Sequence, residues 1–202
     1  VDPLEGTNTC AKGLNGSIAT IALAPRGGFL HAPDMYMEKI AVGPAARGVI
    51  DINASPTENL QRVADAKQCY IEDLTVVILD RPRHDKAVDE IRKAGARIHL
   101  ITDGDVAPAI AAAVEGSGVD MLLGVGGAPE GVLAAAALKC MGGDMQGRLV
   151  FMNNEERDRA TSMGINDFEK VYQCDEMANG DVVFAATGVT SGELLRGIRY
   201  FS

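Results

Sequence analysis

The sequence predicts a layered α/β protein in which an antiparallel, β-rich N-terminal part precedes a sheet of alternating strands and helices. From residue 75 onward, short β-branched and apolar runs alternate with longer segments of helical spacing, which is typical of a parallel or mixed sheet covered by helices. Within the first 50 residues, short apolar runs are separated by glycine and proline. That pattern is typical of antiparallel strands joined by turns.

The N-terminal elements follow from residue type and spacing. Residues 17–24 (SIATIALA) mix β-branched and small apolar side chains and predict a strand, and residues 27–33 and 36–43 predict two more short strands. A surface helix is expected over residues 55–69, because Ser55 precedes a segment with helical apolar spacing.

The remaining chain predicts strands and helices in turn, with Gly95 and Gly142 as helix ends and Pro129 as a helix start. The expected strands are 75–80, 96–102, 121–126, 147–151 and 181–189. The expected helices are 85–95, 105–116, 129–143, 153–164 and a short last one at 191–197. A soft boundary near residues 70–75 suggests two domains, 1–74 and 75–202.

Composition and charge exclude several classes of protein. The net charge of −9 and the pI near 4.8 argue against a nucleic-acid binder. No apolar stretch approaches the roughly 20 residues that a membrane-spanning helix needs. The four cysteines lie far apart without CxxC spacing, so we expect reduced thiols in a cytoplasmic protein and no zinc site.

Charged residues and glycines follow three consecutive predicted strands. The loops are DRPRHD (80–85), TDGD (102–105) and GGAPEG (126–131). In open α/β sheets the carboxyl ends of the strands line the ligand crevice. Arginine suits phosphate, and carboxylates suit divalent cations and sugar hydroxyls. The residues expected to line one crevice are Arg81, Arg83, His84, Asp103, Asp105 and Glu130.

Each of these residues also has an ordinary structural explanation. Glu130 would suit the first turn of any helix, Asp105 could be an N-cap, and Asp103-Gly104 could form a turn. The arginines could be solvated loop charges, and a single loop histidine is more often a local hydrogen-bonding residue than a catalyst. Charges in three independent loops at one sheet edge nevertheless favour a site.

Residues 1–7 (VDPLEGT) resemble the metal-binding signature of the lithium-sensitive phosphatase superfamily, Asp-Pro-x-Asp-Gly-Thr, with Glu5 in place of the second Asp. Together with four later blocks, they resemble the class II fructose-1,6-bisphosphatases, the bacterial type that includes dual fructose/sedoheptulose bisphosphatases. The later blocks are APDMYMEK (32–39), RPRHD (81–85), DGDV (103–106) and GVGGAPEGV (124–132). The resemblance covers essentially the whole chain and implies the sugar phosphatase fold, with residues 1–74 in its metal-binding first domain and 75–202 in its second.

The resemblance implies a role for each matched residue. Asp2, Glu5 and Glu130 would bind two or more Mn²⁺ or Mg²⁺ ions, which prefer oxygen ligands, and Thr7 would position the attacking water. Asp2, Glu5 and Thr7 are therefore the expected catalytic residues, and Glu5, Gly6 and Thr7 would contact the scissile phosphate. The expected substrate contacts are Tyr36, Arg81, Pro82 and Arg83 at the second phosphate, Asp103, Gly104 and Asp105 at sugar hydroxyls, and Gly127 through its backbone.

The implied activity is hydrolysis of the 1-phosphate of fructose 1,6-bisphosphate, as in gluconeogenesis or carbon fixation. Sedoheptulose 1,7-bisphosphate, an inositol phosphate, or an inactive sugar-phosphate-binding module remain as alternatives. By analogy with the superfamily we expect a homo-oligomer, a dimer or a tetramer. Family members extend beyond both ends of the matched region, so we expect the chain to be a fragment truncated at both ends.

Overall fold

The computed structural model of the protein describes residues 1–199 and contains two sheets. The smaller sheet has the strand order β1-β2-β9, and the larger has the order β5-β4-β6-β3-β7-β8. The strands are β1 (Asp2–Glu5), β2 (Ile18–Leu23), β3 (Tyr36–Val42), β4 (Thr75–Leu79), β5 (Arg97–Ile101), β6 (Met121–Gly127), β7 (Asp144–Val150), β8 (Val171–Gln173) and β9 (Val183–Gly188).

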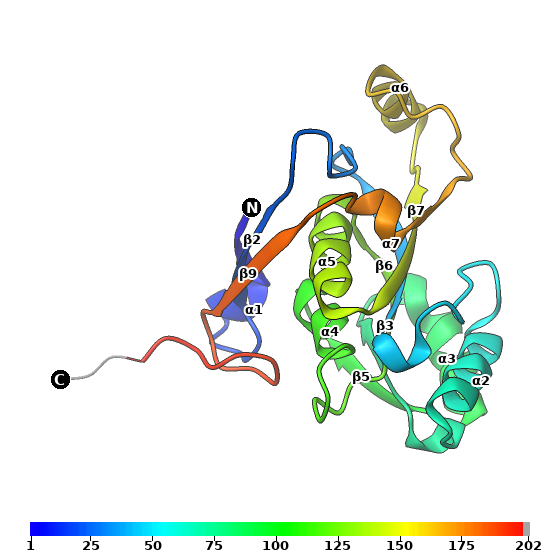
Figure 1. Ribbon diagram of the computed structural model, residues 1–202. Coiled ribbons are helices and arrows are strands. Elements are labelled where there is room, and N and C mark those ends of the chain that lie inside the picture. Colours follow the sequence, from blue (N-terminus) through cyan, green and yellow to red (C-terminus); the bar gives the residue numbers. More distant parts are fainter. Residues whose placement is uncertain (200–202) are drawn as a thin grey trace.

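Helices separate and cover the two sheets. They are α1 (Thr7–Ala11), α2 (Pro56–Lys67), α3 (Asp85–Ala94), α4 (Val106–Ala111), α5 (Ala128–Met141), α6 (Asn154–Ser162) and α7 (Cys174–Met177), with single 3₁₀ turns at Pro44–Ala46, Ile71–Asp73 and Pro82–His84. From left to right, Figure 1 shows the small sheet, then α4 and α5, then the large sheet, then α2 and α3. This order of layers confirms the predicted α/β class.

The large sheet is mixed, and its topology brings several loops to one edge. Strands β4, β5 and β6 are parallel, and β3 runs antiparallel to both β6 and β7. The carboxyl ends of the parallel strands therefore share an edge with the start of β3, where Tyr36 lies opposite Gly127 of β6.

Helix α5 is buried almost all round because it lies between the two sheets. Its middle is a run of alanines, residues 134–137, none of them more than 1% exposed. One face packs in a core cluster with Met37 and Met145 of the large sheet, and the other packs in a cluster with Ile18 of the small sheet. Methyl-sized side chains let a single helix fill the space between two sheets.

The opposite face of the large sheet is covered by α2 and α3. Leu60 of α2 and Ile91 of α3 are fully buried in the same cluster as Val76 of β4. Helix α2 begins at the predicted place, because Ser55 and Glu58 form a reciprocal capping box.

Two predicted elements are wrong. Residues 27–33 form no strand beyond one isolated bridge from Phe29 to Ala178, because this glycine- and proline-rich segment connects the two sheets. Residues 191–197 form no helix. They fold back on the end of β9 instead, with Ile198 N–H donating to Val189 O at 3.2 Å.

Several short elements carry too weak a pattern to be predicted: β1, α1, β8 and α7. Each sheet combines strands from both sides of residue 74. The division into domains 1–74 and 75–202 stays a prediction.

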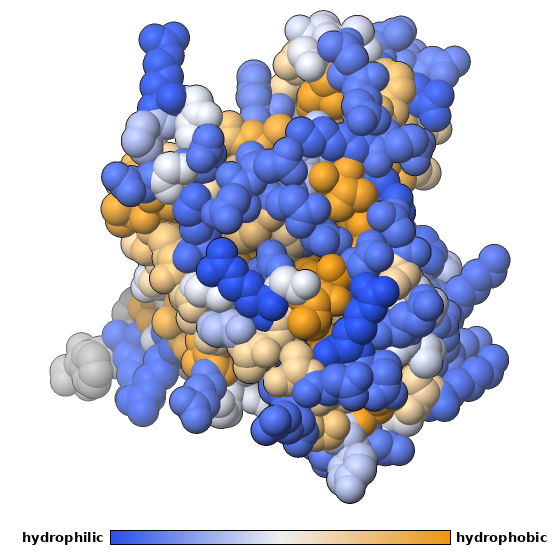
Figure 2. Space-filling view, turned by 45° about the vertical axis from the view of Figure 1, so that its right-hand side comes forward, coloured by the Kyte–Doolittle hydropathy of each residue, from blue (hydrophilic) through white to orange (hydrophobic). Residues whose placement is uncertain are grey.

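Within residues 1–199, no helix combines the length and the apolar character that crossing a membrane requires. In Figure 2, hydrophilic side chains cover most of the upper and right-hand parts of this face, and hydrophobic side chains gather over its left and lower central parts. All four cysteines are free thiols.

The packing of α5 predicts that Ala135→Leu destabilises the protein. The added side chain has no space between the sheets, so we expect the free energy of unfolding to fall by about 1–3 kcal/mol. Urea unfolding of the intact protein measures this. Met141→Leu, at the partly exposed end of the same helix, is the control and should leave the midpoint nearly unchanged. Equal midpoints for both variants would contradict the tight packing.

Candidate active site

The three charged loops meet at one edge of the large sheet, as the sequence predicts. The arginines of the loop after β4 tie it to the loop after β5 and to the last residues of β6. Arg81 Nη2 donates to Thr102 O at 2.7 Å, and Arg83 Nη2 donates to Val125 O at 2.6 Å. The loops after β4, β5 and β6 are therefore neighbours in space.

This edge carries two positive groups beside an aromatic ring. The guanidinium of Arg83 lies 4.9 Å from the ring centroid of Tyr36, a cation–π arrangement. Arg81 also donates to Asp80 O at 2.7 Å. Pro82, the first residue of the 3₁₀ turn Pro82–His84, separates the two arginines. Exposed guanidinium groups of this kind can bind phosphate through several N–H donors.

His84, by contrast, is a local hydrogen-bonding residue, as its isolation in the sequence predicts. Its Nδ1 lies 2.7 Å from Leu79 O, and its Nε2 accepts from Val125 N–H at 2.8 Å. This pairing requires a neutral ring with the proton on Nδ1. Burial also lowers the pKa of His84, which favours the same neutral ring. Both ring nitrogens are occupied by hydrogen bonds within the fold.

Three carboxylates gather beside this edge. Asp2 and Glu5 come from β1 and Glu130 from the first turn of α5, and one oxygen of each lies within 4.8 Å of the others. Residues three apart in a regular strand point to opposite faces. A register shift against β2 between Asp2 and Glu5 adds one residue, which brings both side chains to the same side.

The loop after β5 docks directly onto the segment that carries Glu5. Asp103 Oδ2 accepts from Asn8 N–H at 2.9 Å, and Glu5 Oε1 accepts from Val106 N–H at 3.1 Å. The two segments thus exchange hydrogen bonds in both directions, so the first N–H of α4 helps to hold the buried Glu5 carboxylate.

Glycines make this close approach possible. Gly6 has φ +76°, the left-handed turn that separates β1 from α1, and Thr7 follows it as the exposed first residue of α1. A Cβ at Gly104, where φ is +77°, would lie 3.2 Å from Gly6 Cα. A Cβ at Gly127 would overlap the Glu130 carboxylate.

The electrostatics of the carboxylate cluster centre on Glu5, which is 6% exposed. Burial, followed by the nearby charge of Asp105, raises the pKa of Glu5 to about 8, against a lowering by the Val106 hydrogen bond and a smaller raising by Asp2. Without a cation, Glu5 therefore holds a proton near neutral pH. One of the three clustered carboxylates thus resists ionisation because it is buried beside like charges. A hard divalent cation would supply a balancing positive charge, and it prefers oxygen ligands of this kind.

Asp105 differs from the expectation that its side chain caps a helix. It precedes α4, but no helix N–H bonds its side chain. Instead Asp105 Oδ2 lies 2.6 Å from Nζ of Lys39, and the two side chains are only 8% and 1% exposed.

Sequence reasoning missed Lys39. A signal was present, since Lys39 shares the strand face of Met37 and Ala41, where a lysine in an apolar run is unusual.

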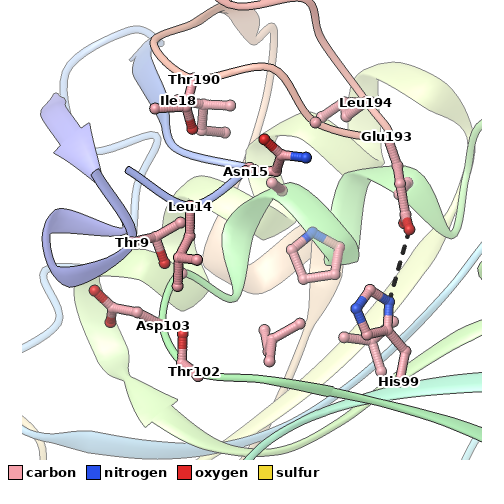
Figure 3. A pocket seen from close by; sticks show the side chains of 18 of the residues that line it. Thr9, Leu14, Asn15, Ile18, His99, Thr102, Asp103, Thr190, Glu193 and Leu194 are labelled. Carbon is pink, nitrogen blue, oxygen red and sulfur yellow. Dashed lines mark ion pairs between the residues drawn. The ribbon is translucent and has the colours of Figure 1, made fainter. Parts of the chain in front are cut away.

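A cavity of about 560 Å³ borders the candidate site. It lies between the α1 loop, β5, α4 and residues 190–195, and Asp103 and Gly104 line it. Figure 3 shows Asp103 and Thr102 near Thr9, with the ion pair of His99 and Glu193, 3.8 Å long, farther along the wall. The three clustered carboxylates lie outside this lining, so Asp103 is the charged side chain that links the cavity to the docked loops.

Comparisons with known proteins agree with this geometry. The profile of the family described as bacterial fructose-1,6-bisphosphatase, glpX-encoded, matches residues 1–202. The chain is 47% identical to a protein of Synechococcus sp. (strain JA-3-3Ab) and 48% identical to proteins of Microcystis aeruginosa and Synechocystis sp.. Each relative is named D-fructose 1,6-bisphosphatase class 2/sedoheptulose 1,7-bisphosphatase.

All of the chain aligns with these relatives, and it spans 62% of their length. The match includes both the carboxylate segment of β1 and the three loops of the large sheet. The chain therefore belongs to the glpX-encoded bacterial fructose-1,6-bisphosphatase family, as its sequence blocks predict.

Proposed function

We propose that the protein hydrolyses the 1-phosphate of fructose 1,6-bisphosphate to give fructose 6-phosphate and phosphate, in a reaction that requires divalent cations. The observation that carries the proposal is the convergence of Asp2, Glu5 and Glu130 beside the arginine-bearing loop, in a member of this family. Carboxylates recruit the cations that bind phosphate, and arginines bind a second phosphate.

The carboxylate cluster fits a hard divalent cation by its chemistry, because all three ligands are oxygens and their atoms lie within 4.8 Å of one another. We propose Mn²⁺ or Mg²⁺, two or more per site, with Asp2, Glu5 and Glu130 as ligands. When bound, such cations supply Lewis acidity that lowers the pKa of water and offsets phosphate charge. Glu5 gives up its proton on binding and its carboxylate stays oriented by Val106 N–H.

The reacting phosphate is held by the segment that follows β1. Glu5, Gly6 and Thr7 lie at the turn into α1, and the Thr7 hydroxyl positions the attacking water. Burial raises the pKa of Cys174 to about 12, so this thiol is a poor nucleophile near neutral pH. The proposed mechanism is direct attack by water.

The other end of the substrate meets the large sheet. Tyr36, Arg81, Pro82 and Arg83 hold its second phosphate, and the Gly127 backbone contacts the ligand. Asp103, Gly104 and Asp105 accept hydrogen bonds from sugar hydroxyls. In Asp105 the oxygen that would accept such a bond is Oδ1, because Oδ2 is paired with Lys39.

A second candidate substrate is sedoheptulose 1,7-bisphosphate, because the relatives' names include both activities. The same two phosphate-binding ends would accept the longer sugar. An inactive sugar-phosphate-binding module stays as the alternative outside the enzyme class. The homo-oligomeric state and the cytoplasmic location stay predictions.

Phosphate release from fructose 1,6-bisphosphate tests the proposed function. We expect release with Mn²⁺ and none with EDTA, in the intact protein. Glu5→Gln should lower kcat by more than about 100-fold, since even changes outside the direct ligands cost 10–100-fold. Sedoheptulose 1,7-bisphosphate is assayed in parallel.

The matched control for that assay is Glu115→Gln, which removes an exposed carboxylate far from β1 in sequence and should keep normal turnover. Binding of the sugar phosphate in EDTA with no turnover under any condition would identify the binding module instead. Normal turnover by Glu5→Gln would refute the assignment of the cation ligands.

Arg83 provides a test of substrate orientation. If it holds the second phosphate, Arg83→Ala should raise KM for fructose 1,6-bisphosphate by roughly 10-fold or more, because a charge-assisted hydrogen bond contributes about 1.5–3 kcal/mol. KM for fructose 1-phosphate, which lacks that phosphate, should change little. Arg26→Ala, at an exposed position, is the control. Equal effects on both substrates would exclude this role.

The raised pKa of Glu5 predicts how stability depends on pH. The folded, metal-free protein holds this proton up to about pH 8, whereas the unfolded chain releases it near 4.5. The associated stabilisation is complete below pH 4.5 and is lost as pH rises through 8. Calorimetry in EDTA should therefore give a larger fall in Tm between pH 5.5 and 8.5 for the wild type than for Glu5→Gln.

Added Mn²⁺ should raise Tm more at pH 8.5 than at pH 5.5, because the cation has to displace the Glu5 proton at the lower pH. If Tm changes with pH in the same way in the wild type and in Glu5→Gln, the pKa of Glu5 is not raised and the prediction is wrong.

A further inference from the structure

The side chain of Lys39 lies in a channel lined by glycines, between the large sheet and helix α5. Its neighbours on the adjacent strands are Gly124 of β6 and Gly147 of β7. A Cβ at Gly131 of α5 would lie 3.4 Å from Lys39 Cδ, and one at Gly126 would lie 3.0 Å from Nζ. The side chain therefore passes between glycines, and the residue as a whole is only 1% exposed.

The ammonium group is aimed at Asp105. The distance from Lys39 Nζ to Asp105 Oδ2 is 2.6 Å, but the approach angle makes no well-aligned hydrogen bond, so the contact is chiefly Coulombic. A buried charge without its partner is strongly destabilising. The two side chains therefore hold each other in place.

This ion pair fixes the residue directly before α4. Lys39 holds the Asp105 carboxylate, and the next residue along the chain, Val106, donates its N–H to Glu5 at 3.1 Å. On the other side of Asp105, Asp103 accepts from Asn8 of α1.

We propose that Lys39 is a positioning residue of the active site, which acts through Asp105 to hold residues 103–106 against the segment that carries Glu5. The inference rests on the proposed function, since it assigns Glu5 to cation binding. Lys39 contacts neither the substrate nor the cation. Its loss releases the loop, so the Glu5 carboxylate loses its orienting N–H and binds the cation more weakly.

Mn²⁺ affinity tests this role in the intact protein, by calorimetry without substrate. The variants are Lys39→Met and the double variant Lys39→Met/Asp105→Asn, which leaves no unpaired buried charge and keeps the net charge of the pair. We expect both to bind Mn²⁺ about 10–100-fold more weakly than the wild type, the range typical of groups that orient metal ligands. The double variant should melt at a higher temperature than Lys39→Met.

The matched control uses the other ion pair of β3, Glu38 and Arg148, which are 2.7 Å apart and partly exposed. Glu38→Gln/Arg148→Met removes one charge of each sign and should leave Mn²⁺ affinity within about twofold of the wild type, since exposed pairs contribute little. This comparison separates loss of positioning from a general loss of stability.

If the folded double variant binds Mn²⁺ like the wild type, the ion pair serves the fold alone and the inference is overturned. This outcome is independent of the substrate: a wild type that binds Mn²⁺ but releases no phosphate refutes the proposed function and leaves the Lys39 comparison valid. A wild type that binds no Mn²⁺ overturns both.

Discussion

Mutual repulsion of clustered carboxylates is the constraint on which the candidate site depends. The half-buried Asp2 and Glu130 converge on the buried Glu5, although gathering like charges is unfavourable. The chain meets this cost with a proton on Glu5 and a helix N–H from Val106, while the buried ammonium of Lys39 pairs with the neighbouring carboxylate of Asp105. A bound divalent cation would offset the repulsion directly, so the site is built to be most favourable when it is filled.

Rigid elements of both sheets hold the carboxylates together. Glu5 belongs to the small sheet through β1, whereas the loop that binds it follows β5 of the large sheet. Helix α5 spans the space between the sheets and carries Glu130 in its first turn. The buried alanines at residues 134–137 keep this helix thin. Its thickness sets the distance between the two sheets, and so the distance between the two halves of the site.

Much of the site could be anticipated from local sequence because its residues lie where chain geometry puts them. The loops after β4, β5 and β6 had to meet, since the carboxyl ends of parallel strands share one edge. Prediction failed where long-range packing overrides local pattern. Residues 191–197 have helix-forming side chains but fold back on β9, and residues 27–33 bridge the sheets instead of joining one. Lys39 was missed because a buried lysine only makes sense beside its partner, which lies 66 positions away.

The sequence by itself determined the layered α/β class, the order of most strands and helices, and the family, because periodicity and local motifs encode these directly. Tertiary structure alone decided which charges meet. The shift in β1 turned Asp2 and Glu5 to one side, and the docking of residues 103–106 buried Glu5 and raised its pKa. Such effects arise from desolvation and from contacts between distant segments, and neither can be read from a linear pattern of residues.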